Sequence, residues 1–443
     1  MRTRSRASSS TISGKGRDPS GPPQDWAALP VEVLDKVLRL GGQRHIAGSA
    51  RLTCRQWAFS VAAACSGLCV RERGPVGWPD RFTGVERLHW ASPKWRGGGG
   101  LTPMGRLKSL KLGDVSDRTL ATLQLPPSLT QLDLFNCGRV KGPGLAGVAL
   151  LANLTDLDLD QCDVTNAALQ HIKCMKSLRR LNLSWGQFAG AELGALTGLT
   201  SLTDLNLRGC NVCDSELEVL SHMPALTRLD IGETDQVTDS GLASLKRLTA
   251  LSHLDLPVDR GVTHVGLAHL AQLPLLTTLY MSLCDEFTDK EMAEVGRCRS
   301  LTLLCMVQSR HVTDAGLVEL RSLTRLKSLQ LINFFQSTGA WLAAIKTLPS
   351  LERLNLSACG IIDDSALSAI KHLPALTSLD ITISRITDAG LLHLRHMTSL
   401  KSIVLRGSSV TDAGMAALSA ALPNLPAVTT QQHVAMHGLQ FIA

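Results

Sequence analysis

The sequence predicts an α/β solenoid, a curved horseshoe with parallel strands on its concave face and helices on its convex face. The first observation is a motif, L-x-x-L-x-L or a close variant, that returns every 22 to 25 residues. The second is composition: hydrophobic residues make up 44% of the 443 residues but aromatics only 4%, so small aliphatic side chains dominate, as regular stacking requires. The motif begins at Leu107, Leu129, Leu154, Leu178, Leu202, Leu226, Leu251, Leu276, Leu301, Leu326, Leu351, Leu376 and Leu400.

Each unit has the same internal order. Alternating apolar residues predict a short strand whose leucines point inward. A small residue follows at the ninth position, where a thiol packs as a small hydrophobe and can donate weakly to a backbone carbonyl. A segment such as Val312 to Leu317 (VTDAGL) then supplies Thr or Asp to accept from free N–H groups and begin a helix, and a proline such as Pro274 often follows that helix. The ninth position is cysteine at Cys137, Cys162, Cys210, Cys284 and Cys359.

These units resemble the cysteine-containing class of leucine-rich repeat (LRR) over about residues 85–428. One repeat cannot bury its own apolar face, but stacked neighbours form a continuous core. Weaker copies at Val85, Leu88 and Trp90, and at Leu425 and Val428, are expected to be terminal capping units.

The chain divides into five expected parts. Residues 1–24 hold six serines and five basic residues against one acidic residue, which predicts a disordered tail; an organelle transit peptide has the same character. Residues 25–70 form a small all-α module, and 71–106 a linker with the N-terminal capping repeat. Residues 107–428 hold about thirteen repeats, and 429–443 form a C-terminal tail or cap.

The module over residues 25–70 resembles an F-box. That family has Leu-Pro-x-Glu-aliphatic-Leu, a spacer, then Cys-Arg-x-Trp, and the chain has each of these residues, although two glycines at 41 and 42 weaken any helix in the spacer. The resemblance implies binding to a Skp-type adaptor and its cullin complex. The alternative is that these helices only cap the first repeat, because so short a stretch needs other apolar surface to bury itself. The expected adaptor-binding residues are Leu29, Pro30, Glu32, Val33, Leu34, Val37, Leu38, Cys54, Arg55 and Trp57.

The concave face is the expected partner-binding surface. Asp or Asn is usual at the middle strand position of this repeat class, and there it is more often part of the scaffold than of the binding specificity. The eighth to tenth repeats depart from this pattern by placing apolar residues at exposed strand positions, and Trp and Arg on two adjacent earlier repeats are typical interface anchors. Apolar groups of a partner are expected over Tyr280 and Ile332, and basic groups near Asp158 and Asp160. The candidate contact residues are Trp185, Arg208, Tyr280, Leu283, Leu303, Val307 and Ile332.

Charge and motif content argue against several other functions. The net charge of +7 arises in residues 1–106, which hold 17 Lys/Arg against 7 Asp/Glu, whereas the rest holds 28 against 31; nucleic-acid binding is therefore not expected on the repeats. No apolar run is long enough to predict a membrane span. Cys210 and Cys213 form a C-x-x-C pair with no second pair at zinc-site spacing, so we expect no metal and no other cofactor. Nucleophile-elbow, P-loop and zinc-protease motifs are missing, so no enzyme is expected.

The sequence thus predicts the substrate-recognition subunit of a Skp/cullin/F-box type ubiquitin ligase, with its target protein on the concave face. Cysteines at a packing position and no signal peptide favour a reduced compartment, the cytoplasm or nucleus. The alternative is a non-catalytic LRR scaffold for protein interactions whose N-terminal helices only seal the solenoid.

Overall fold

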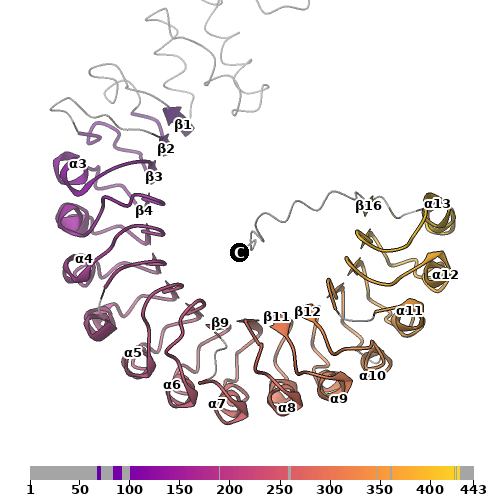
Figure 1. The fold of residues 1–443 in the computed structure, drawn as a ribbon. Coiled ribbons are helices and arrows are strands. Elements are labelled where there is room, and N and C mark those ends of the chain that lie inside the picture. The colour runs from indigo at the N-terminus through magenta and orange to yellow at the C-terminus, as the bar shows by residue number, and fades with distance from the viewer. Residues whose placement is uncertain are drawn as a thin grey trace, which may run out of the picture.

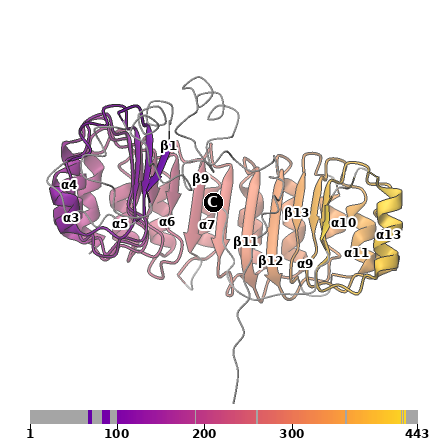
Figure 2. The same ribbon diagram turned by 90° about the horizontal axis from the view of Figure 1, so that it is seen from above.

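A computed structural model describes residues 67–70, 83–91, 100–188, 190–257, 261–346, 348–359, 362–423, 425 and 427–429. These residues form an arc with one parallel sheet along its inner side and helices along its outer side (Figure 1). Figure 2 shows the inner sheet from above, with the helices behind it. The predicted solenoid is confirmed.

The sheet of the described residues has 16 strands in the order of the sequence, each parallel to its neighbours. Each of the thirteen predicted motifs supplies one strand, and the two flanking copies supply β2 and β16. The strands are β1 (Gly67–Val70), β2 (Arg87–Trp90), β3 (Ser109–Leu112), β4 (Gln131–Asp133), β5 (Asp156–Asp158), β6 (Arg180–Asn182), β7 (Asp204–Asn206), β8 (Arg228–Asp230), β9 (His253–Pro257), β10 (Thr278–Ser282), β11 (Leu303–Ser309), β12 (Ser328–Phe334), β13 (Arg353–Asn355), β14 (Ser378–Asp380), β15 (Ser402–Val404) and β16 (Ala427–Thr429).

The first strand corrects one predicted boundary. Gly67–Val70 was expected to end the helical module over residues 25–70, but these four residues form β1 and pair with β2 in parallel, Leu68 beside Leu88. The strand forms because β2 offers a free edge, which an apolar segment can extend. The rest of the module, residues 25–66, lies outside the described residues.

Short helices follow the strands on the convex side. Several end four residues before a proline, as α7 does before Pro274, which agrees with the predicted stop signals. The α-helices are α3 (Asp117–Thr122), α4 (Asn166–Ile172), α5 (Asp214–Leu220), α6 (Asp239–Leu245), α7 (His264–Leu270), α8 (Asp289–Arg297), α9 (Asp314–Leu317), α10 (Leu342–Ile345), α11 (Asp364–Ile370), α12 (Asp388–Leu391) and α13 (Asp412–Ala421). The 3₁₀ helices are η3 (Pro143–Ala146), η4 (Val148–Leu150), η5 (Gly190–Gly198) and η6 (Val318–Ser322).

The core is continuous along the arc. Motif leucines and helix leucines form one hydrophobic cluster that runs from Val85 to Leu425. In the eighth repeat, for example, Leu279 and Met281 of β10 belong to the same cluster as the buried Met292 and Val295 of α8. Because each repeat covers the leucines of its neighbours, no repeat has a core of its own.

The cysteines at the ninth position join successive repeats. The Sγ of Cys162 donates to the backbone oxygen of Leu134 at 3.2 Å, and the Sγ of Cys359 to that of Leu331 at 3.0 Å; in both cases the acceptor is the last leucine of the motif in the preceding repeat. Burial raises the pKa of each of these two thiols to about 12, so they stay protonated and able to donate. The predicted packing role of these cysteines is confirmed.

A second link between repeats uses the T-D-x-G segment. Thr313 caps α9 with its side chain, as predicted, but its backbone N–H and hydroxyl also donate to the carboxylate of Asp289 in the preceding repeat, at 2.9 and 2.7 Å. Gly316 completes the arrangement, because a Cβ there would collide with Asp289 Oδ1. The same clamp joins Asp239 to Thr263, and Asp364 to Thr387.

A substitution at the clamp glycine tests this link. Gly316→Ala should lower the free energy of unfolding by about 1 to 3 kcal/mol, because the new methyl group pushes Asp289 away from Thr313. The midpoint of urea unfolding measures the change. Asp289→Ala removes the carboxylate but keeps the Cα, which would lie 2.8 Å from the new methyl group, so in that background only part of the cost of Gly316→Ala should be relieved.

Gly147→Ala is the matched control. Gly147 has helical backbone angles, and nothing within 4 Å of the Cβ position, so this variant should be as stable as the wild type or slightly more so. Equal losses at Gly147 and Gly316 would show that the carboxylate contact does not matter.

Candidate functional site: the concave face

The middle strand residues form one row across the concave face, as predicted. Most carry Asp or Asn, and these side chains bond to their own backbone two residues on. Asp133 accepts from the N–H of Phe135 and Asp380 from that of Thr382, at 2.9 and 3.0 Å. Such a bond turns the chain out of the strand after three residues. The acid-rich row is therefore largely scaffold, as the sequence indicated. In order, the row reads Lys111, Asp133, Asp158, Asn182, Asn206, Asp230, Asp255, Tyr280, Cys305, Gln330, Asn355, Asp380 and Val404.

The pattern breaks at the centre of the arc. Tyr280, Cys305 and Gln330 have no carboxylate or short amide for the turn, and β10, β11 and β12 run on for five, seven and seven residues. In β9 the cause differs: Asp255 is present, but two residues later stands Pro257, which has no N–H to donate. The carboxylate of Asp255 is thus available for another partner.

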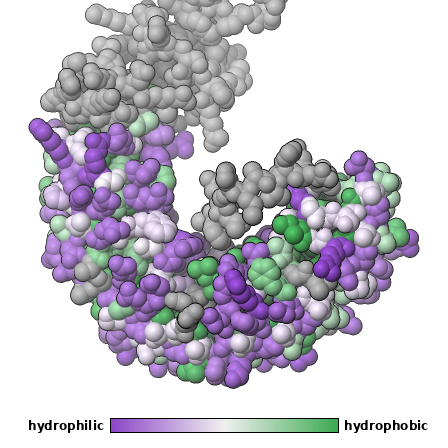
Figure 3. Space-filling view, viewed as in Figure 1, coloured by the Kyte–Doolittle hydropathy of each residue, from purple (hydrophilic) through white to green (hydrophobic). Residues whose placement is uncertain are grey.

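The lengthened strands carry an apolar patch. Leu303, Val307 and Ile332 are partly exposed on β11 and β12, with Val307 and Ile332 side by side in register. Leu283, just after β10, has 54% of its surface exposed. Figure 3 shows hydrophobic side chains on the inner edge of the arc, in the stretch where Figure 1 places these strands. We call Tyr280, Leu283, Leu303, Val307 and Ile332 the apolar patch.

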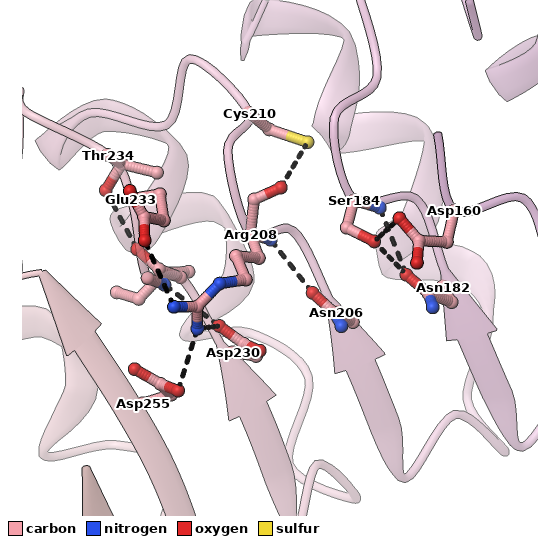
Figure 4. Close-up of polar contacts among 12 residues, drawn as sticks. Asp160, Asn182, Ser184, Asn206, Arg208, Cys210, Asp230, Glu233, Thr234 and Asp255 are labelled. Atoms are coloured by element: carbon pink, nitrogen blue, oxygen red, sulfur yellow. Dashed lines mark hydrogen bonds and ion pairs between the residues drawn. The ribbon is translucent and has the colours of Figure 1, made fainter. Parts of the chain in front are cut away.

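An acidic cluster borders the patch. Arg208, which follows β7, reaches three carboxylates on the next two repeats (Figure 4): its Nη1 lies 3.0 Å from Asp255 Oδ2 and 3.7 Å from Asp230 Oδ1, and its Nη2 lies 3.2 Å from Glu233 Oε1. One guanidinium faces three carboxyl groups, so the cluster has an excess of two negative charges when all three are ionised. Asp255 pairs in register with Tyr280, which places this excess directly beside the patch.

Burial and repulsion set the protonation of the cluster. Burial and the neighbouring Asp230 raise the pKa of Asp255 to about 7, although Arg208 opposes this. Burial lowers the pKa of Arg208, but attraction to Asp255, Asp230 and Glu233 outweighs it, so Arg208 stays charged. Burial, together with Cys305 and Asp255, raises the pKa of the Tyr280 phenol, which stays neutral. Near pH 7 the cluster is thus a carboxylate-rich site with too few cations.

The front of the face differs from the centre. Trp185, after β6, has a left-handed backbone (φ 63°) and is 46% exposed, with its indole against the turn of the next repeat. A Cβ at Gly209 would lie 2.5 Å from the Trp185 ring, so only glycine allows this packing. Asp160 accepts from the Ser184 hydroxyl at 2.8 Å (Figure 4).

The predicted contact residues thus fall into two groups. The apolar patch lies on three adjacent strands and the turn after β10, and Trp185 lies four strands from β10, roughly 19 Å along the sheet. Arg208 connects the two through Asp255, but its guanidinium is held by carboxylates rather than free to anchor a partner. The predicted adaptor-binding residues, Leu29 to Trp57, lie outside the described residues.

Sequence reasoning did not identify two features of this site. Asp255 was read as one more scaffold residue, although Pro257 two positions on was a usable signal. Phe335, just after β12, is 52% exposed and was not singled out, because it follows the strand motif.

Other chemistry is sparse in the described part of the chain. In it no helix has the length and apolar content needed to cross a bilayer, and no three His, Cys, Asp or Glu side chains are grouped to hold a metal ion. The C-x-x-C pair serves packing and capping: Cys210 donates to the backbone oxygen of Leu183 at 3.3 Å, and Cys213 is the N-cap residue of α5.

Comparisons with known proteins agree with the geometry. A family model described as "Leucine Rich repeat" matches residues 347–371. An LRR protein of Leptospira interrogans aligns with a TM-score of 0.52 at 17% identity, over 85% of this chain and 98% of that chain. The chain has the fold of a leucine-rich-repeat solenoid.

Two further solved structures align with most of this chain. In the TLR13–ssRNA13 complex, the matching chain gives a TM-score of 0.54 at 18% identity, over 83% of this chain and 53% of that chain. An internalin of Listeria monocytogenes aligns with a TM-score of 0.49 at 19% identity, over 91% of this chain and 95% of that chain. At such identities the likeness concerns the fold and not the ligand. No curated protein matches the sequence.

The Asp255 carboxyl gives a pH-dependent prediction. Its folded pKa of about 7 lies above the ordinary 3.8, so the folded state binds the extra proton and wild-type stability falls as pH rises through this range. Asparagine has nearly the same shape but does not ionise, so the stability of the variant does not fall in this way as the pH rises. Asp255→Asn should therefore gain stability relative to the wild type between about pH 5 and pH 8, on the order of 1 kcal/mol, measured by urea unfolding.

Asp235→Asn is the matched control, since Asp235 is exposed and outside the cluster. A relative stability of Asp255→Asn that does not change with pH would contradict the assigned burial and repulsion.

Proposed function

We propose that this LRR protein is a non-catalytic receptor that holds a target protein on its concave face. The observation that carries this proposal is the apolar patch on β10 to β12. Soluble proteins seldom leave contiguous apolar side chains on an open sheet unless a partner covers them. The patch also lies where the repeat pattern is broken, so the scaffold does not require these side chains.

The charge of the face favours a protein over a nucleic acid. From β4 to β9 the described concave positions hold eight carboxylates against three guanidiniums, and phosphates would be repelled. The carboxylates are Asp133, Asp156, Asp158, Asp160, Asp204, Asp230, Glu233 and Asp255, and the guanidiniums are Arg180, Arg208 and Arg228.

The more specific part of the proposal is that the chain is the substrate-recognition subunit of a Skp/cullin/F-box type ubiquitin ligase. Its support is the sequence motif over Leu29 to Trp57. In this role the N-terminal module binds the adaptor and the solenoid binds the target, which raises the effective concentration of target lysines near the conjugating enzyme. The chain would work in the cytoplasm or nucleus. An LRR scaffold without a ligase is the alternative, in which the same module only caps the solenoid.

Adaptor binding is tested by Leu29→Ala with Pro30→Ala. Affinity purification of this double variant should recover at least about tenfold less adaptor and cullin, because the rim of the docking surface is lost, while target recovery stays unchanged. Leu150→Ala, at a side chain 83% exposed on the repeats, is the matched control. Equal adaptor recovery from the double variant and the control would contradict the ligase role. The alternative, an LRR scaffold without a ligase, would then be favoured.

Target binding is tested by Tyr280→Asp with Ile332→Asp. Two charges on the apolar patch should abolish recovery of the target without affecting the adaptor, because burying an unpaired carboxylate is costly. Circular dichroism should show an unchanged fold. Target recovery equal to that of the wild type would reject the patch as the binding surface.

A further inference from the structure

The concave face carries two unlike surfaces that share an edge. The apolar patch covers β10 to β12, and the Arg208 cluster, with its excess of two carboxylates, covers the turns and strands of β7 to β9. Asp255 and Tyr280 are register neighbours at this edge. A ligand that covers the patch therefore also approaches the carboxylates.

The size of the combined surface fits an extended peptide. Adjacent strands lie about 4.8 Å apart, so Asp255 on β9 and Ile332 on β12 are separated by roughly 15 Å, which four to five extended residues span. The net negative charge of the Arg208 cluster also restricts which ligand groups can cover it. Covering it with neutral groups would bury a net negative charge, whereas a cation of the ligand would neutralise this charge.

We infer that the bound target presents an extended segment with a Lys or Arg side chain three to five residues from an aliphatic or aromatic one. The cation lies against Asp255, Glu233 and Asp230, and the apolar side chain lies over Tyr280, Val307 and Ile332. This inference rests on the proposed receptor function and narrows it to one class of ligand.

Arg208 has a positioning role in this arrangement. Its guanidinium, on a side chain only 19% exposed, forms ion pairs with all three carboxylates and so holds them together. Its guanidinium contacts the Gly232 turn so closely that a Cβ there would lie 2.7 Å from Nη1, which fixes it in place. The cluster is thus assembled before the ligand arrives.

The experiment is selection from a random peptide library on the immobilised full chain, followed by fluorescence anisotropy with the enriched peptides. Enriched sequences should combine Lys or Arg with an apolar residue at the stated spacing. Glu233→Gln with Asp255→Asn, which removes two charges and keeps the side-chain shapes, should weaken their binding at least about tenfold. Tyr280→Ser with Ile332→Ser should weaken it by a similar factor.

Matched controls lie in the same repeats. Asp235→Asn removes an exposed charge outside the cluster, and Leu275→Ser removes a side chain that is 55% exposed in the turn before β10. Both should bind the peptides within about twofold of the wild type. Urea midpoints show that each variant is folded.

Several outcomes would overturn the inference. These are enrichment of acidic or uncharged sequences, no enrichment at all, or a charge variant that binds as tightly as the wild type. The receptor function would survive any of them if a target recovered by affinity purification were still lost on Tyr280→Asp with Ile332→Asp. If that variant retained its target, the receptor function itself would fail.

Discussion

The structure depends on contacts between repeats rather than within them. Each repeat has leucines that its neighbour must cover, and the polar links follow the same rule: Asp289 bonds to Thr313 one repeat later, and Cys359 to the oxygen of Leu331 one repeat earlier. The last position of each T-D-x-G segment is glycine because the carboxylate of the previous repeat occupies the space that a side chain would need. Stability and shape therefore come from one repeated interface, which leaves the concave side chains free to vary.

The proposed function depends on the concave positions at which the repeat pattern changes. Asp and Asn at the middle position of most strands accept from the backbone N–H two residues on, which turns the chain outward. Between β9 and β12 this use ceases, either because the residue is no longer Asp or Asn, as at Tyr280, or because Pro257 offers no donor. The strands lengthen, an apolar patch appears, and Asp255 turns to Arg208. Departures from the repeat pattern on adjacent strands thus place the apolar patch beside a carboxylate that the turn does not use.

Much of this could be predicted from the sequence, because the leucine period sets the strands, the helices and the concave row. The ninth-position cysteines and the apolar departures at Tyr280 and Ile332 were visible in the same way. The Asp289 clamp was not, since it joins residues 24 apart whose contact depends on how repeats stack. Nor was the Arg208 cluster, which spans three repeats, or β1, which forms only because β2 offers it an edge.

The central claim is that the inner wall at β9 to β12 holds the partner. Site-specific photo-crosslinking tests it most directly, with a photoreactive residue at Gln330, on the inner wall, or at Leu392, which is 56% exposed just after α12 on the convex side. A crosslink to the target from position 330 and none from 392 is the predicted result. A crosslink from 392 with none from 330 would show that the partner binds elsewhere and would contradict the account.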